Sequence, residues 1–330
     1  MQMPDNVHNC IHCNKCVKKC SFLTKYNIDL EAFSKREDLA YHCFLCNDCN
    51  IVCPKDIDGN KISICMRINK INSDIKNKKE IEKKYKFLML EKTDYIFKNY
   101  NNVISESVIF SGCNFSSFYP DALRYILKKF KEEYNIGSVF DCCGKPIAEL
   151  GIDEEGIVKK LEDRMISHGV KEIVTLCPNC YYFLSPRINS IRIISIYEKL
   201  NELGLKFNLN IDEEINLFIP CPDKKTKHIK NSILNIINKD IIVKEINDIN
   251  CCGLGGCAIV NEKEIASGFI EKLKSKRLNN LYVYCATCAG NFNRNEINNV
   301  KHLLLSMLGI DNLEIKNKSS IINRAMFKFY

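Results

Sequence analysis

Short apolar runs alternate with amphipathic helical patterns over the last two thirds of the chain. The run at residues 108–110 has the character of a buried strand, and apolar residues at helical spacing follow it over 122–130. Pro120 suits the first position of that helix. A second helical pattern at 157–165 leads into another buried run at 173–176. This alternation predicts α/β architecture with a parallel sheet.

The same order of elements returns once more before the end of the chain. Strand-like runs occupy residues 215–219 and 281–284, and helical patterns occupy 229–237 and 265–273. A near-constant offset between several landmarks is hard to obtain by chance. The pattern therefore predicts a duplicated domain, in which each copy contains two strands and two helices in the same order.

The chain of 330 residues is long enough for two or three domains with cores of their own. Hydrophobic residues make up 46% of it and charged residues 27%, which is ordinary globular composition and argues against disorder. The most apolar stretch, at residues 302–308, is far too short to cross a bilayer. The first six residues lack the features of an export signal, so we expect a cytoplasmic protein with reduced cysteines.

Basic residues concentrate between residues 61 and 100. This segment contains eleven Lys and Arg against five Asp and Glu, and so supplies most of the net charge of +8. Such a stripe suits an acidic partner, an anionic membrane surface or nucleic acid, or else it is a solvated helix face. The near-neutral remainder of the chain argues against nucleic acid. The apolar residues within the segment are expected in the core rather than in a membrane: Phe87, Leu88, Met89, Leu90 and Tyr95.

Twenty cysteines in one chain point to metal or redox chemistry, and eighteen of them fall into four groups. Two groups are identical runs with the spacing C-x2-C-x2-C-x3-C: Cys10, Cys13, Cys16 and Cys20, and then Cys43, Cys46, Cys49 and Cys53. The other two are Cys113, Cys142, Cys143, Cys177 and Cys180, and then Cys221, Cys251, Cys252, Cys285 and Cys288. Cys65 and Cys257 are left over. Both are expected to be small core residues, with a ligand role as the alternative for Cys257.

The two runs resemble the ligand pattern of two-cluster bacterial ferredoxins, in which the fourth cysteine of each run reaches the other cluster. The resemblance implies two 4Fe–4S cubane clusters. One would be held by Cys10, Cys13, Cys16 and Cys53, hereafter the first quartet, and the other by Cys20, Cys43, Cys46 and Cys49, the second quartet. Structural zinc usually takes two spaced pairs of ligands, which these runs match poorly. His12 and His42 are expected beside the sites rather than as ligands.

The two five-cysteine groups repeat together with the elements around them. Corresponding cysteines are 108 or 109 residues apart, each group begins where a strand ends, and each contains a Cys-Cys-Gly sequence. Ligand sites in parallel sheets form at such strand ends. Gly144 and Gly253 would let the backbone pass close to a bound group, or else they are ordinary turn residues. Five thiols exceed the four that a cubane or a zinc ion needs, which suits either an unusual cluster or four ligands with one free thiol.

The repeated pattern resembles the CCG (cysteine-rich) domain found in the B-subunit of heterodisulfide reductase, and the N-terminal runs resemble the C-subunit of the same enzyme. Their fusion resembles its D-subunit and the iron–sulfur subunits of anaerobic glycerol-3-phosphate dehydrogenase and glycolate oxidase. Gly144 with Pro146, and Gly253 with Gly256, match the family motifs. The resemblance implies one or two further 4Fe–4S clusters, noncubane in type and catalytic, with zinc as the alternative in one copy. Their ligands would be the first quintet (Cys113, Cys142, Cys143, Cys177, Cys180) and the second quintet (Cys221, Cys251, Cys252, Cys285, Cys288).

From these patterns we expect an α-helical two-cluster ferredoxin domain followed by two duplicated α/β (CCG) domains with parallel sheets. The 4Fe–4S ferredoxin-type domain would cover residues 1–65 and a basic helical linker residues 66–104. The first CCG domain would cover 105–208, and the second CCG domain, with C-terminal helices, 209–330.

The resemblance implies an iron–sulfur oxidoreductase that is a subunit of a flavin-dependent dehydrogenase or of a heterodisulfide reductase-like complex. One hypothesis is a relay between a flavoprotein partner and a quinone, a ferredoxin or another acceptor. Another is cleavage of a thiol disulfide at a noncubane cluster, and a third is a zinc-stabilised interaction protein. No G-x-G-x-x-G fingerprint is present, so the flavin or nicotinamide is expected on a partner. Segment 61–100 would dock that partner or the inner face of the cell membrane, in an anaerobic host.

Overall fold

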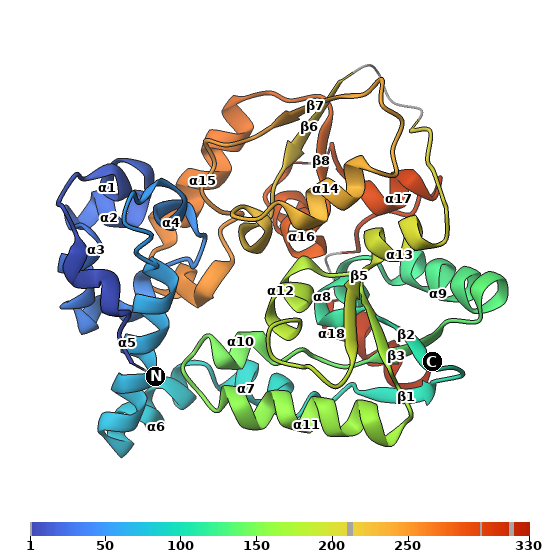
Figure 1. Ribbon diagram of the computed structural model, residues 1–330, viewed down its shortest axis with the longest axis horizontal. Helices are drawn as coiled ribbons and strands as arrows, with labels where there is room; N and C mark the ends of the chain where they lie inside the picture. Colours follow the sequence, from blue (N-terminus) through green and yellow to red (C-terminus); the bar gives the residue numbers. More distant parts are fainter. Residues whose placement is uncertain (1, 210–213, 298, 317–319) are drawn as a thin grey trace.

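The computed structural model describes residues 2–209, 214–297, 299–316 and 320–330. A part made of short helices comes first, two α/β parts follow, and the final helix returns to the first α/β part (Figure 1). The N-terminal helices are η1 (Asp5–Asn9), α1 (Lys15–Lys19), α2 (Ser21–Tyr26), α3 (Leu30–Ser34), η2 (Glu37–His42), α4 (Asp48–Val52), α5 (Gly59–Ser73), α6 (Ile75–Lys84) and α7 (Lys86–Lys92).

The two cysteine runs at the N-terminus fold in the same way. Asn14 and Asn47, which immediately precede α1 and α4, both have positive φ angles of 57° and 68°. His12 and Leu45, two residues earlier in each run, are also in the left-handed region. Asparagine tolerates this region better than most residues do. Each run is therefore a loop that turns twice and then enters a short helix.

The first α/β part contains a five-stranded sheet in the order β1-β3-β2-β4-β5. β1 pairs with β3 in the antiparallel sense, and the remaining pairs are parallel. The strands are β1 (Asn99–Asn102), β2 (Ser107–Phe110), β3 (Gly137–Phe140), β4 (Glu172–Thr175) and β5 (Arg192–Ser195). The helices are α8 (Gly112–Phe118), α9 (Pro120–Tyr134), α10 (Lys145–Ala148), α11 (Glu154–Ser167), α12 (Pro178–Leu184) and α13 (Ile196–Glu202).

The second α/β part contains a parallel sheet in the order β7-β6-β8-β9. Its strands are β6 (Glu214–Phe218), β7 (Ile242–Glu245), β8 (Leu281–Val283) and β9 (Val300–His302). Its helices are η3 (Cys221–Asp223), α14 (His228–Leu234), η4 (Gly255–Val260), α15 (Lys263–Ser275), α16 (Ala286–Arg294) and α17 (Leu303–Met307). The chain closes with α18 (Ser320–Met326) and η5 (Phe327–Phe329).

The predicted strands and helices of the duplicated region are confirmed, at β2, β4, β6 and β8 and at α9, α11, α14 and α15. Two expectations need correction. The segment expected to be a helical linker, 66–104, contains the strand β1. Because β1 runs antiparallel to β3, the first sheet is not purely parallel. β1 lies at the edge of its sheet and consists of three asparagines and a tyrosine. Because an edge strand needs few apolar residues, its sequence carries little hydrophobic signal.

The two α/β parts share one continuous hydrophobic core. Phe115 and Phe118 of α8, and Tyr119 directly after it, pack together with residues of the second sheet and its helices. Gly290 on α16 lies so close that a Cβ atom there would be 2.6 Å from the ring of Phe118. The contact between α8 and α16 therefore requires glycine at this position.

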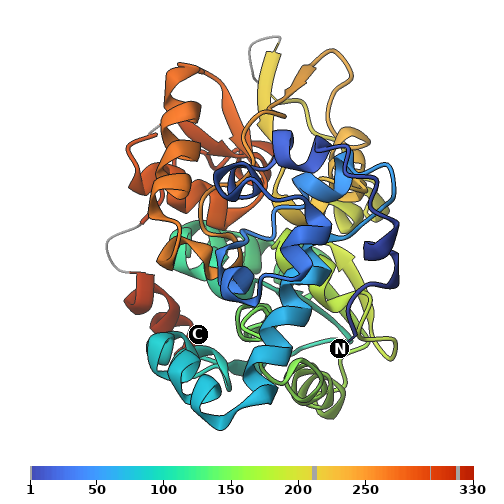
Figure 2. The same ribbon diagram turned by 90° about the vertical axis from the view of Figure 1, so that its left-hand side faces the viewer.

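The N-terminal part packs against the second α/β part, beside α15 (Figures 1 and 2). The carboxylate of Glu262, which is fully buried, lies 2.7 Å from Lys25 Nζ, from Tyr26 Oη and from His42 Nδ1. All three donors come from the N-terminal part. Because a buried carboxylate is costly unless it is paired, this network fixes how the two parts meet.

Arg67, on α5, joins all three parts of the molecule. Its guanidinium is fully buried and donates to backbone oxygens of the N-terminal part (Ala40 and Cys43), the first α/β part (Glu149) and the second (Gly256). The basic segment is therefore not uniformly a solvated helix face. Within the described residues, no helix combines the length and the hydrophobicity needed to span a membrane.

Candidate metal centres

The cysteines stand in four separate groups of thiols. None of the twenty, all of which lie in the described ranges, forms a disulfide bond, and most are buried. Thiols in such numbers are unusual in a protein interior unless they bind a metal or a cluster.

The first quartet surrounds one cavity near the surface. Cys10, Cys13, Cys16 and Cys53 all line it, together with Leu30, Ile57 and Pro54. Cys13 is exposed, Cys10 and Cys53 are half-buried, and Cys16 is buried. The crossed set expected from the ferredoxin pattern is thus brought together in space, with one edge open to solvent.

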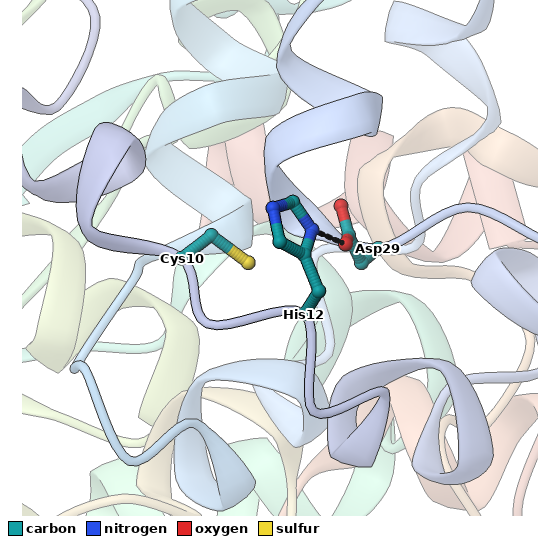
Figure 3. A group of neighbouring side chains, drawn as sticks. All are labelled: Cys10, His12 and Asp29. Carbon is teal, nitrogen blue, oxygen red and sulfur yellow. Dashed lines mark hydrogen bonds and ion pairs between the residues drawn. The ribbon is translucent and has the colours of Figure 1, made fainter.

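His12 lies beside Cys10 but is held by carboxylates (Figure 3). Its Nδ1 is 2.7 Å from Asp29 Oδ2, and its Nε2 is 3.4 Å from Glu31 Oε2. The hydrogen bond with Asp29 raises the pKa of His12, which favours the imidazolium form. Because an imidazolium has no lone pair for a metal, this geometry supports a place beside the site rather than a ligand role.

The second quartet is more deeply placed. Cys20, Cys43, Cys46 and Cys49 are all buried and are electrostatic neighbours of one another. Burial raises the pKa of Cys46 and Cys49 well above the ordinary thiol value. These groups are therefore neutral thiols unless a cationic core binds them as thiolates. Gly59 leaves room here, because a Cβ atom would lie 2.6 Å from Cys49 Sγ.

Both quintets lie where strands of their sheets end. In the first part, Cys113 follows β2, the Cys142–Cys143 pair follows β3, and Cys177 follows β4. In the second part the same sites follow β6, β7 and β8. Because parallel strands present their carboxyl ends at one edge, distant cysteines converge there.

The thiols of each quintet form an unbroken series of contacts. In the first quintet, Cys113 interacts with Cys142, Cys142 with Cys143, and Cys143 with Cys180, which in turn interacts with Cys177. The second quintet repeats this series. It begins with Cys221 Sγ and Cys251 Sγ 3.8 Å apart and continues through Cys252, Cys288 and Cys285.

The second cysteine of each Cys-Cys pair has a distinct electrostatic role. Hydrogen bonds from Cys142 and Cys180 lower the pKa of Cys143, and those from Cys251 and Cys288 lower the pKa of Cys252. The same position in each copy thus favours a thiolate that its neighbours stabilise. The likeness does not extend to every position. Hydrogen bonds from Cys177 and Cys288 also lower the pKa of Cys285, whereas its counterpart Cys177 differs: the hydrogen bond with Cys180 lowers its pKa, but the one with Cys285 and burial together raise it to about 12.

The four groups form a row. Cys46 of the second quartet and Cys221 of the second quintet are electrostatic neighbours. Across the interface of the α/β parts, the thiols of Cys177 and Cys285 interact, so the quintets also meet. The two quartets are joined by α1, which connects Cys16 with Cys20, and by α4, which connects Cys49 with Cys53. The order in space is therefore first quartet, second quartet, second quintet, first quintet, which differs from the order along the chain.

Buried lysines, which the sequence analysis did not identify, accompany the quintets. Lys224 Nζ lies 2.8 Å from Asp48 Oδ1 and donates to Asn250 O at 2.6 Å, beside Cys46 and Cys221. Lys92 Nζ lies 2.8 Å from Glu91 Oε1, beside Cys113 and Cys142. A buried cation next to several thiols compensates the negative charge that thiolate ligation creates.

The residues fit iron–sulfur groups in three respects. The donors are thiols in sets of four, as iron–sulfur clusters require, and in sets of five, which provide one thiol more. His302 is buried between Phe115 and Tyr119, close to Cys285, and among the described residues neither of its ring nitrogens has a hydrogen-bond partner. Gly112 leaves space, because a Cβ atom there would lie 2.9 Å from Cys180 Sγ.

The remaining predicted residues have ordinary surroundings. Cys65 is fully buried, as expected for a core residue. Cys257 is only half-buried and lies beside Arg67 and Lys145, and burial raises its pKa to about 11. Gly144 and Gly253 both have positive φ, at 84° and 96°, directly after their Cys-Cys pairs. They provide the turns that lead away from the quintets.

Comparison with known proteins identifies the repeated part. The cysteine-rich domain family, CCG, matches residues 107–185 and again residues 215–293, ranges that contain all ten quintet cysteines. An uncharacterized iron–sulfur protein of Methanococcus maripaludis is 24% identical over 320 residues, covering 84% of this chain and 63% of the relative. The B-subunit of fumarate reductase (CoM/CoB) from Methanothermobacter marburgensis is 23% identical over 321 residues, covering 84% and 64%.

The chain spans just under two thirds of the length of these two relatives. Among solved structures, an aspartate racemase of Picrophilus torridus matches 66% of this chain and 98% of its own, with 13% identity and a TM-score of 0.33, which is too low to inform fold or function. The chain therefore contains two copies of the CCG cysteine-rich domain, and over most of its length it is similar to a protein named as an iron–sulfur protein.

Proposed function

We propose that the chain is a redox subunit that carries electrons along a row of iron–sulfur sites between a flavoprotein partner and a quinone or another acceptor. The observation that carries this proposal is the continuity of the four thiol groups. The quartets share the helices α1 and α4, Cys46 lies beside Cys221, and Cys177 lies beside Cys285. A catalytic site alone would need no such row.

In this proposal the quartets hold two 4Fe–4S cubane clusters and the quintets hold one or two further 4Fe–4S clusters of noncubane type. When bound, such clusters take up and release single electrons. The polypeptide holds the sites next to one another and buries every cysteine of the second quartet and of the first quintet. The N-terminal helical part would be a ferredoxin-type domain, followed by CCG domains over the ranges expected from the sequence, with β1 added to the first.

The two ends of the row differ in access. Cys13 is exposed at the first quartet, whereas the cysteines of the first quintet are all buried. A flavoprotein can approach the exposed end closely enough to exchange electrons. The first quintet, at the other end, would then deliver them to the acceptor or receive them from it.

A second candidate function is reduction or formation of a disulfide at the quintets. Its support is the contact between Cys177 and Cys285, which brings both quintets to one junction. One relative is named as part of a fumarate reductase (CoM/CoB). A disulfide or thiol substrate would have to bind at this junction. In the relay, by contrast, no sulfur compound contacts the quintets.

The experiment begins with anaerobic purification and analysis of iron, sulfide and zinc. We expect iron and sulfide in equal amounts and, by EPR spectroscopy, signals of cubanes together with a second set. Cys143→Ser and Cys252→Ser should change only the second set. Loss of the cubane signals in either variant would show that the ligands are divided wrongly. Zinc without iron, or colourless protein after reconstitution, would refute the proposal.

Two further measurements separate the candidate functions. Anaerobic capture of partners from the native host should retain a flavoprotein if the chain is a relay. Adding a small disulfide or dithiol should leave the second set of EPR signals unchanged in a relay, and should alter it if the quintets bind sulfur substrates.

A further inference from the structure

Helices α6 and α7 present apolar side chains to solvent. Phe87 is 87% exposed, Ile75 is 73% exposed and Leu90 is 62% exposed. The expectation that the apolar residues of this segment belong to the core is wrong for Phe87 and Leu90, although it is confirmed for Tyr95. Single exposed apolar residues are common on protein surfaces, but three in adjacent short helices, one of them an almost fully exposed phenylalanine, indicate a contact surface.

The same helices carry a dense positive charge. Between residues 75 and 92 there are seven lysines, three glutamates and no arginine. In the described structure, none of the exposed lysines on α6 and α7 pairs with a carboxylate, and Lys84 bonds only to the amide oxygen of Asn261. Their charge is therefore available to an anionic partner.

Composition distinguishes between a lipid surface and a protein as that partner. Protein interfaces are enriched in arginine and depleted in lysine. Helices that lie on membranes combine lysines with phenylalanine and leucine, because the ammonium groups meet anionic head groups while the apolar side chains enter the boundary of the acyl region. Lysines alone, around Ile75, Phe87 and Leu90, match the second composition.

This surface is connected directly to one end of the thiol row. The last residue of α7, Lys92, lies beside Cys113 and Cys142, and Tyr95 packs on the same two cysteines. The C-terminal helix α18 packs next to α7 through Arg324 and Glu91, and its Ile321 and Ile322 are also exposed (Figure 2). The first quintet therefore lies directly behind the C-terminal end of α7, whereas Ile81 of α6 and Leu88 of α7 pack in the core of the N-terminal part.

We propose that the surface formed by α6 and α7 binds an anionic lipid bilayer. Ile75, Phe87 and Leu90 enter the interfacial region, and the lysines of both helices contact the head groups. Insofar as the chain is the relay proposed above, this places the first quintet next to the bilayer, where a lipid-soluble quinone resides.

The apolar contribution is tested by flotation of the full chain with vesicles. Vesicles of phosphatidylglycerol and phosphatidylcholine should carry the protein with them, and pure phosphatidylcholine vesicles should carry much less. F87S/L90S should weaken binding to the anionic vesicles at least about tenfold. The matched control is Y125S/I242S, which removes two exposed apolar residues from α9 and β7. Equal binding by both variants would overturn the proposal.

The contribution of the lysines to lipid binding is tested by comparing two double variants, one on α6 and one on α9. Lys79 and Lys83 are one helical turn apart on α6 and are exposed, and Lys128 and Lys131 are exposed on α9. K79E/K83E should weaken binding about tenfold or more, whereas K128E/K131E changes the net charge equally and should have little effect. Equal losses in the two variants would show that net charge, rather than this surface, drives binding.

A spectroscopic probe reports the position of the surface directly. The chain contains no tryptophan, so Phe87→Trp introduces a single one. Its emission should shift to shorter wavelength with anionic vesicles, whereas the emission of Tyr125→Trp should not shift. Absence of a shift for Phe87→Trp with vesicles bound would place another surface on the lipid.

If anionic vesicles do not bind at all, α6 and α7 face a protein and the proposal fails. These measurements need no knowledge of the electron acceptor. Lipid binding by protein without iron–sulfur groups would refute the relay alone, and a working relay without lipid binding would refute only this inference.

Discussion

The two CCG copies carry the same five cysteines in the same arrangement, but their neighbours are different. Beside the second quintet lie Cys46 and Asp48 of the N-terminal part. Beside the first quintet lie Tyr95 and Lys92, which belong to the segment that ends in α7. One copy thus faces another thiol group, and the other faces a surface of the molecule.

The cations beside the two quintets also differ between the copies. Lys224 follows Cys221 within the second copy, whereas Lys92 comes from outside the first copy's matched range. Burial alone lowers the pKa of a lysine, but nearby thiols and carboxylates raise it at both positions. Duplication therefore accounts for the thiols but not for the cations, which come from different places in the chain. In the proposed relay, the different neighbours divide the roles of the copies: the second exchanges electrons with the quartets, and the first with the acceptor.

The largest effect is expected from removing a cysteine of the second quartet, the thiol group that lies beside the second copy. Cys46→Ser should remove the group held by the second quartet and destabilise the N-terminal part by several kcal/mol, because binding of such a group is coupled to folding. The signals of the quintets should persist. Iron analysis and limited proteolysis of the N-terminal part measure both effects. Cys65→Ser, which alters a buried cysteine outside every group, is the control and should retain its iron. A Cys46 variant with full iron content would contradict the ligand assignment.

Replacing each of the two buried lysines tests the same difference between the copies, with a smaller expected effect on stability. Lys224→Met leaves the carboxylate of Asp48 buried without its cation and should cost about 3–5 kcal/mol in unfolding free energy. Lys92→Met should cost only about 1–3 kcal/mol, because Glu91 keeps Arg324 at 2.7 Å. Denaturant unfolding measures this difference.

The same pair of variants separates the sites by reduction potential. Removing a cation disfavours the more negative, reduced state of a neighbouring group. An EPR-monitored redox titration should therefore find lower potentials for the second-quintet and second-quartet signals in Lys224→Met, and for the first-quintet signals alone in Lys92→Met. Identical shifts in both variants would mean that the copies do not differ as proposed.

How far the fold and the thiol groups could be predicted from the sequence depends on how far apart the interacting residues lie along the chain. The strands β2, β4, β6 and β8 and the helices α9, α11, α14 and α15 were predictable, because their periodicity is local, whereas the strands β3, β5, β7 and β9 were not predicted. The edge strand β1 lacks that periodicity. The row of thiol groups depends on contacts between residues about a hundred or more positions apart, such as Cys46 with Cys221, which no local pattern encodes. Arg67 belongs to the basic segment 61–100, and its own surroundings in the sequence do not distinguish it from an exposed charge. Its four acceptors are backbone oxygens from distant parts of the chain.

A smaller effect tests how tightly the two copies are joined. Gly290→Ala should cost about 1–3 kcal/mol, because the new methyl group must displace the ring of Phe118, which belongs to the other copy. A Cβ atom at Gly268, on α15, would have no described atom within 4 Å. Gly268→Ala should therefore stabilise the protein by roughly 0.5–1 kcal/mol, since alanine favours the helix. Thermal unfolding of both variants gives the difference. Similar values would mean that α8 and α16 are not in close contact in solution.

The smallest effect tests the docking of the N-terminal part on the second copy alone. Glu262→Gln should cost about 1 kcal/mol at neutral pH, because Lys25 remains partly solvated and the amide keeps some hydrogen bonds. Burial alone would raise the pKa of Glu262, but the hydrogen bonds from Lys25, His42 and Tyr26 together lower it below the ordinary value of 4.5. A carboxylate with a lowered pKa stabilises the folded state above the pKa of the unfolded chain, and this contribution is lost as the pH falls through the lowered value. The difference in unfolding free energy between the native chain and the variant should therefore shrink as the pH falls below about 4.5. A difference that grew on acidification would mean that the carboxylate is protonated in the folded protein, and that the N-terminal part is held to the second copy by other contacts.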